Sequence, residues 1–151
     1  MQSITRILYT YALLLIPVGL ASVLFNSQTS SLGWNPAGKT GLIVCAIVAL
    51  LSLLFAVMAK KGASWAGWAA LALSFLVLSY SGSTVFKLVR DIPAAANTMI
   101  AAKKEAGEPL SEEAAVAAIK FRMALFSTLG LISLSTFMRL WLARSSEKPA
   151  T

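Results

Sequence analysis

The segment Thr40–Ala59, TGLIVCAIVALLSLLFAVMA, contains no charged residue. Three other stretches have a similar length and a similarly apolar composition, at Ile7–Phe25, Trp65–Phe86 and Met123–Leu142. A helix needs about 20 apolar residues to cross a hydrocarbon core about 30 Å thick. Arg139, near the end of the last stretch, is the only charge inside any of the four. The sequence therefore predicts an all-α integral membrane protein with four transmembrane helices.

The composition supports this class. The chain of 151 residues is 58% hydrophobic and 13% charged, whereas soluble proteins carry about 25% charged residues. Its net charge of +7 suggests nucleic-acid binding at first sight, but the basic residues gather at the ends of the apolar stretches, where Lys and Arg reach lipid headgroups. These residues are Lys60, Lys61, Lys87, Arg90, Lys120, Arg122, Arg139 and Arg144. We expect contact with membrane lipids and no nucleic-acid partner.

The connections between the spans set the topology. We expect a single membrane domain over residues 1–151, with spans at about 7–25, 40–59, 65–86 and 121–143. The polar segment Asn26–Lys39 predicts a loop with Trp34 as an interface anchor. The connection Lys60–Ser64 is so short that the second and third helices must be antiparallel neighbours. Its last residue, Ser64, is expected to cap the third helix through its hydroxyl.

Residues 91–120 form the only sizeable polar segment, and they predict an extramembrane helical hairpin between the third and fourth spans. Asp91-Ile-Pro93 begins a new segment, and Gly107-Glu108-Pro109 ends its first arm. Ser111 is a natural N-cap, from which one continuous helix is expected to reach Arg144. Alanines on both arms are expected to form the contact: Ala94, Ala95, Ala96, Ala101 and Ala102 on the first, and Ala114, Ala115, Ala117 and Ala118 on the second.

Several chemistries are excluded by the residue types. The chain has no histidine, which removes His-ligated metals and haem, the Ser-His-Asp triad and imidazole proton relays. Cys45 is the single cysteine, and we interpret it as a packing residue. The acidic residues Glu105, Glu108, Glu112 and Glu113 lie beside one turn, where helix-dipole and solubility roles explain them. We expect no cofactor, no metal site and no enzymatic activity.

Small residues recur at helix-packing spacing on the second and third spans. Steps of three, four or seven residues keep one face of a helix, and small side chains there let membrane helices approach closely. The face serves either the interior of the bundle or an interface with a partner or a second copy. Its residues are Cys45, Ala49, Ser52 and Ala56 on the second span, and Gly67, Ala70, Ser74 and Ser81 on the third.

Hydroxyl side chains form a second pattern on the last two spans. Ser127, Thr128, Ser133 and Ser135 on the fourth span either bond back to their own helix or line a weakly polar groove.

A third pattern is basic: Lys87, Arg90, Lys120 and Arg122 flank the roots of the hairpin, either as ordinary interfacial anchors or as contacts for an anionic lipid headgroup. Tyr9, Tyr11, Trp65, Trp68 and Trp141 are expected as an aromatic belt at the opposite interface.

The function that these patterns favour is a non-catalytic accessory or structural subunit of a membrane assembly, with other membrane subunits, a second copy of itself and lipids as partners. The alternative is a small oligomeric transporter or lipid-handling protein that uses the Ser/Thr-lined faces of the third and fourth spans.

Basic residues divide almost evenly between the two sides of the membrane, so the positive-inside rule barely discriminates between the two orientations of the chain. The Lys60-Lys61 turn and the basic start favour both termini on the cytoplasmic side of a bacterial inner membrane or an organellar membrane.

Overall fold

The regular structure of the chain is helical throughout the residues that the computed structural model describes, which are 2–28, 36–105, 107 and 110–146. The five helices are α1 (Gln2–Gln28), α2 (Pro36–Lys60), α3 (Ser64–Arg90), α4 (Ile92–Glu105) and α5 (Glu112–Ser145). Four of them, α1, α2, α3 and α5, are long and apolar enough to cross a membrane. The predicted number and order of long apolar helices is therefore confirmed.

The helices extend beyond the apolar stretches from which they were predicted. α1 begins at Gln2 and passes through Pro17, and it continues to Gln28. α2 already begins at Pro36, a residue that is favoured in the first turn of a helix because its ring fixes φ and its missing N–H is not needed there. The loop expected at Asn26–Lys39 is therefore shorter than predicted. Trp34 lies outside the described residues.

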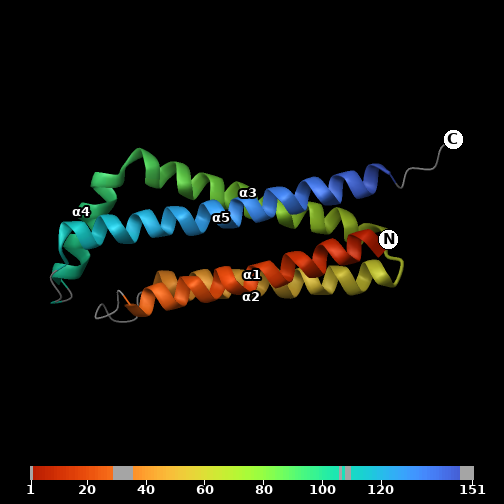
Figure 1. The fold of residues 1–151 in the computed structure, drawn as a ribbon, viewed down its shortest axis with the longest axis horizontal. Helices are drawn as coiled ribbons and strands as arrows, with labels where there is room; N and C mark the ends of the chain where they lie inside the picture. The colour runs from red at the N-terminus through yellow and green to blue at the C-terminus, as the bar shows by residue number, and fades with distance from the viewer. Residues whose placement is uncertain (1, 29–35, 106, 108–109, 147–151) are drawn as a thin grey trace.

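The four long helices form one bundle made of two antiparallel pairs. α1 lies beside α2 and α3 lies beside α5, and the two pairs meet where α1 contacts α5 and α2 contacts α3 (Figure 1). We call the end with the α2–α3 connection the turn end and the opposite end, which carries α4, the hairpin end. Two buried clusters each draw on all four helices: Ile4, Leu8, Ala56, Ala59, Ala66, Ala70, Leu71 and Leu140 near the turn end, and Tyr11, Leu15, Val18, Cys45, Val48, Val77 and Leu129 in the middle.

The α2–α3 connection is a Schellman turn. Gly62 has φ +88°, which a residue with a side chain rarely adopts. Its N–H donates to the carbonyl of Ala59 at 3.1 Å, and the N–H of Ala63 donates to the carbonyl of Met58 at 3.0 Å, as this motif requires. Because the turn places Ala63 at the N-cap, Ser64 is already the first residue of α3. The predicted hydroxyl cap by Ser64 is therefore wrong.

The start of α5 follows the prediction closely. The backbone N–H of Ala114 donates to the Ser111 hydroxyl at 3.3 Å, and Glu112 and Glu113 occupy the first turn, where the helix dipole favours negative charge. From there α5 runs unbroken for 34 residues, a length of about 51 Å at 1.5 Å per residue. One continuous helix from this cap to Arg144 is confirmed.

The contact between α4 and α5 differs from the expected alanine seam. Figure 1 shows α4 crossing the beginning of α5, and only side chains at that crossing can meet. Ala94, Ala101, Ala102 and Ala117 are exposed. The buried cluster instead combines Ala96, Ala115 and Ile119 with larger apolar side chains packed around them: Leu88, Ile92, Met99, Ile100, Leu110, Val116 and Met123. Three of the expected alanines, Ala95, Ala96 and Ala115, therefore take part in this contact, and large side chains surround them.

A buried hydrogen bond joins the two helix pairs in the middle of the bundle. The hydroxyls of Tyr11 on α1 and Ser133 on α5 lie 2.9 Å apart, and both residues are almost fully buried. Tyr11 therefore does not belong to an exposed aromatic belt, which corrects that expectation, whereas Tyr9, Trp65, Trp68 and Trp141 are exposed. The inward direction of Tyr11 follows from its position three residues after Leu8 and four before Leu15, on the same face of α1.

Replacing Tyr11 with Phe keeps the ring and removes the hydroxyl. We expect the bundle to lose about 1 kcal/mol of unfolding free energy, the usual net value of one such bond. The measurement is unfolding followed by circular dichroism in a neutral detergent, with the exposed Tyr9→Phe as the matched control. In the background of Ser133→Ala the Tyr11→Phe change should cost almost nothing, and equal costs in both backgrounds would rule out this bond as the cause.

Candidate functional site

The eight small residues predicted to form a packing face point into the bundle of the single chain. Seven are buried, and Ala49 is half-buried. Ser52, Ser74 and Ser81 are fully buried, and their hydroxyls donate to carbonyls of their own helices, those of Val48, Leu71 and Val77. This face is therefore occupied within the chain, and a partner would need a different surface.

The four hydroxyl residues predicted to line a groove on α5 do not share one face. Ser133 is buried and bonded to Tyr11, whereas Ser127, Thr128 and Ser135 are exposed. Thr128 donates to the carbonyl of Ala124 at 2.8 Å. No hydrogen bond links Ser127 or Ser135 to any residue that the structure describes. Three of the four hydroxyls therefore lie on the outside of the bundle.

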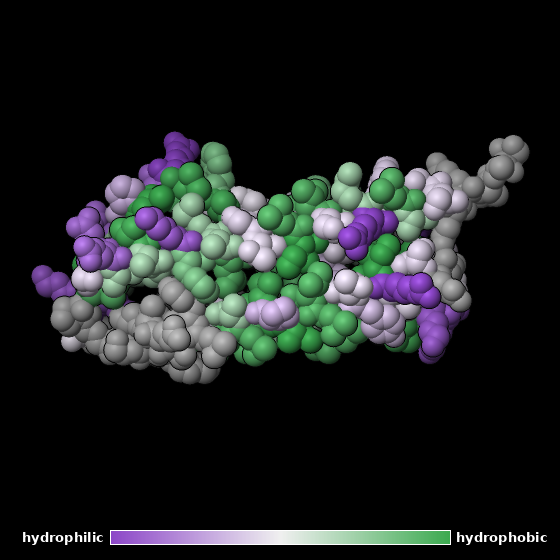
Figure 2. Space-filling view, in the orientation of Figure 1, coloured by the Kyte–Doolittle hydropathy of each residue, from purple (hydrophilic) through white to green (hydrophobic). Residues whose placement is uncertain are grey.

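The outward surface of α5 carries small side chains at helical spacing, as the outward surface of α3 also does at Ala72, Ser79 and Ser83. Ala117, Ala124, Ser127, Thr128 and Ser135 are all exposed, and their spacing keeps them on one face of the helix. The outward surface of α2 instead carries large apolar side chains: Leu42, Ile43, Ile47, Leu50, Leu53, Leu54 and Val57. Figure 2 shows pale, less hydrophobic atoms that interrupt the green surface over the middle of the α3–α5 pair. We call Ala117, Ala124, Ser127, Thr128 and Ser135 the outer small-residue face of α5.

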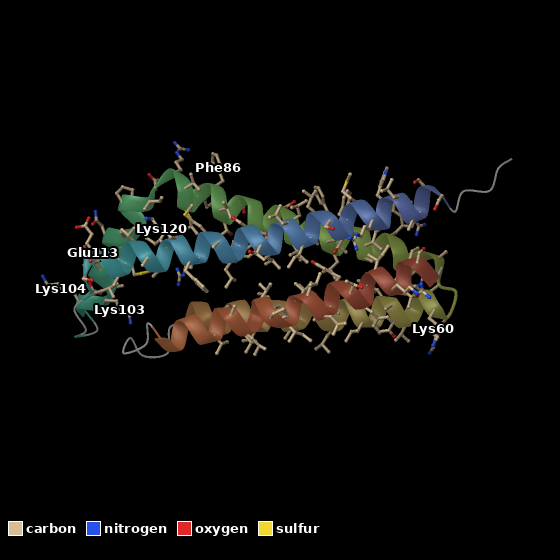
Figure 3. All side chains as sticks on the ribbon, viewed as in Figure 1. Lys60, Phe86, Lys103, Lys104, Glu113 and Lys120 are labelled. Atoms are coloured by element: carbon tan, nitrogen blue, oxygen red, sulfur yellow. The ribbon has the colours of Figure 1, made fainter. Side chains whose placement is uncertain are left out.

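The charged residues gather at the two ends of the bundle. Figure 3 places Lys60 at the turn end, and Lys103, Lys104, Glu113 and Lys120 at the hairpin end. Of the four basic residues predicted to contact an anionic lipid, Lys87, Arg90 and Lys120 are exposed and Arg122 is half-buried. The exposed side chains of Lys87, Arg90 and Lys120 match ordinary interfacial cations. The half-buried side chain of Arg122 has a different environment.

Arg144 makes a set of contacts that the sequence analysis missed. Its Nη1 atom donates to the backbone carbonyl of Ser64 at 3.1 Å, and its guanidinium carbon lies 4.3 Å from the centre of the Trp68 ring. Gly67 leaves the space for this side chain, because a Cβ atom there would lie 2.5 Å from Nη1. The contacts fasten the end of α5 to the start of α3. To predict these contacts from the sequence, one would need to know that α3 packs beside α5, and no local sequence pattern indicates that pairing.

A metal-binding cluster is not seen in the part of the chain that the structure describes, where no three His, Cys, Asp or Glu side chains come together. Comparison with known protein families, with curated proteins and with solved structures gives no match. The fold alone therefore defines the class, which is an all-helical protein with four helices compatible, by length and composition, with a multi-pass membrane protein.

Replacing Gly67 with Ala should displace the Arg144 guanidinium from Ser64 and Trp68. Relative to a Gly→Ala change in the same helix that meets no neighbour, we expect a loss of about 1–2 kcal/mol of unfolding free energy, the combined value of a charged hydrogen bond and a partly exposed cation–π contact. Thermal unfolding in detergent measures it. The control is Gly82→Ala, since a Cβ at Gly82 meets nothing within 4 Å and alanine favours the helix. A full loss that persists in an Arg144→Ala background would contradict this explanation.

Proposed function

We propose that this chain is a non-catalytic integral membrane protein and an accessory or structural subunit of a membrane assembly. The observation that carries the proposal is the outer small-residue face of α5. In a bilayer, lipid tails are as apolar as Leu, so helices associate where small residues allow close packing and where hydroxyls reach a second helix. The equivalent face of α2 and α3 is already covered within the chain, whereas the face on α5 has no covering helix among the described residues.

The membrane placement rests on the exposed apolar side chains. Leu13, Leu14, Leu50 and Leu76 are examples, and each is at least 44% exposed. Large contiguous apolar surfaces on a protein mark contact with a membrane or another protein, and here they continue around the long helices. In this arrangement α4 and the first turns of α5 stand at the membrane surface, where α4 offers a second contact for a partner through its exposed Asn97, Thr98 and Ala101.

The proposal predicts that larger side chains on the outer small-residue face of α5 weaken the binding of the partner protein. Ala124→Leu combined with Thr128→Leu should reduce the co-purifying partner about tenfold, since overpacking a helix contact costs at least about 1 kcal/mol. Native mass spectrometry after gentle extraction from the host membrane measures the ratio. The control is Ala46→Leu, an exposed alanine on α2, which should leave the partner bound. Retention of the partner by the α5 double variant would contradict the proposal.

The alternative is a small oligomeric transporter or lipid-handling protein, and the exposed hydroxyls of Ser127, Thr128 and Ser135 favour it because two copies facing each other would enclose them. Replacing these three residues with Ala separates the two functions, and Ser133 must stay because it holds Tyr11. Loss of solute or lipid transfer by an intact homo-oligomer would favour the alternative. An unchanged complex with a different protein would favour the accessory subunit.

A further inference from the structure

Two arginines of α5 are half-buried, and they differ in their partners. Arg144 donates to the Ser64 carbonyl and lies over Trp68. Arg122 makes no hydrogen bond, ion pair or ring contact with any residue whose side chain the structure describes, which are 3–23, 42–105, 107 and 110–146. A partly buried cation without a partner is costly, so such a side chain is expected to bind an anion from outside the chain.

Arg122 faces the interior of the bundle. It follows Ala118 by four residues and precedes Leu129 by seven, steps that keep one side of a helix. Ser133 and Leu140 continue the same side, and all four of these neighbours on the face are buried. The exposed residues Lys120 and Ala124 lie on the other side. Arg122 is therefore not one of the outward-facing cations near it in the sequence.

The position along the bundle follows from the Tyr11–Ser133 hydrogen bond. α1 and α5 are antiparallel there, since Leu140 packs in the cluster of Ile4 and Leu8. Arg122 precedes Ser133 by about three helical turns, which corresponds to the last part of α1 near Ser22. Figure 1 shows that α5 continues past this end of α1 towards α4. Arg122 thus lies at the level where the fourth span was predicted to begin.

We propose that Arg122 binds the phosphate of an anionic phospholipid whose headgroup enters beside α5 at the end of α1. A guanidinium matches a phosphate with two parallel hydrogen bonds, and these are strong where water is partly excluded. Arg122 is half-buried, so part of its side chain remains open to the surroundings of the bundle. Lys87, Arg90 and Lys120 raise the positive potential around the headgroup.

The test uses the full chain in nanodiscs of phosphatidylcholine with a small fraction of phosphatidylglycerol, and native mass spectrometry counts the retained anionic lipid. Arg122→Gln should weaken its binding about tenfold, the loss expected for one charge-assisted contact. Lys120→Gln, which removes an exposed charge two residues away, should change the binding less than about twofold. Equal losses for the two variants would show diffuse attraction to a basic surface and would overturn the proposal.

A second measurement separates lipid binding from a structural role. In neutral detergent without anionic lipid, Arg122→Gln should unfold at a temperature no lower than the original chain, because it removes an unpaired cation. Added phosphatidylglycerol should raise the unfolding temperature of the original chain and not that of the variant. A lower unfolding temperature for the variant in neutral detergent alone would mean that Arg122 is paired within the chain, and would overturn the proposal.

Two further outcomes identify other sources of the anion, and each overturns the proposal. If inorganic phosphate displaces the lipid and stabilises the original chain equally well, the site is one for a free anion. If Arg122→Gln releases a co-purifying protein and leaves the lipid bound, an acidic side chain of a partner occupies the position. The lipid experiment is independent of the proposed accessory function, because it uses the purified chain alone.

Discussion

The bundle depends on helices that approach each other closely through small inward-facing side chains. Ala56, Ala66, Ser52, Ser74 and Ser81 are fully enclosed at these contacts, and a Cβ on Gly19 would lie only 3.1 Å from the Cβ of Cys45. Dispersion forces between backbones act over short distances, so each small residue brings more neighbouring atoms within range. Because the lipid surroundings proposed for the chain supply no hydrophobic drive between helices, this packing and a few hydrogen bonds must supply the stability.

Different contacts hold the helices together at different depths of the bundle. Near the turn end, Ile4, Leu8 and Leu140 pack with the alanines of α2 and α3. In the middle, the Tyr11–Ser133 hydrogen bond crosses from α1 to α5, and the Tyr80 and Phe126 rings, with centroids 6.0 Å apart, join α3 to α5. At the hairpin end, α4 covers the start of α5 with large apolar side chains. Arg122 lies between the last two regions, where the described helices offer it no counter-charge.

Local sequence signals predicted the parts of this structure that local forces determine. Apolar length located the four long helices, and the Ser111 hydroxyl with the following acidic residues located the start of α5. Ser64 failed as a cap because the Schellman turn at Gly62 moved the helix start by one residue, which depends on turn geometry that the sequence shows only weakly. Tyr11 was wrongly expected at the membrane interface, and the contacts of Arg144 were not predicted. In both cases the hydrogen-bond partner, Ser133 or Ser64, is distant in the chain.

The same limit applies to the surfaces that could carry function. Small residues at helical spacing occur on α2, α3 and α5, and their spacing alone does not show which of them face inward. Exposure separates them: Ala70 and Ser74 are enclosed, whereas Ala124 and Thr128 are not. A bundle of four helices can cover only part of each helix, so an extra small-residue face on a long helix must be left outside. The size of this chain therefore explains why α5 leaves small side chains such as Ala124 and Thr128 outside the bundle, while Arg122 lies on its inner side.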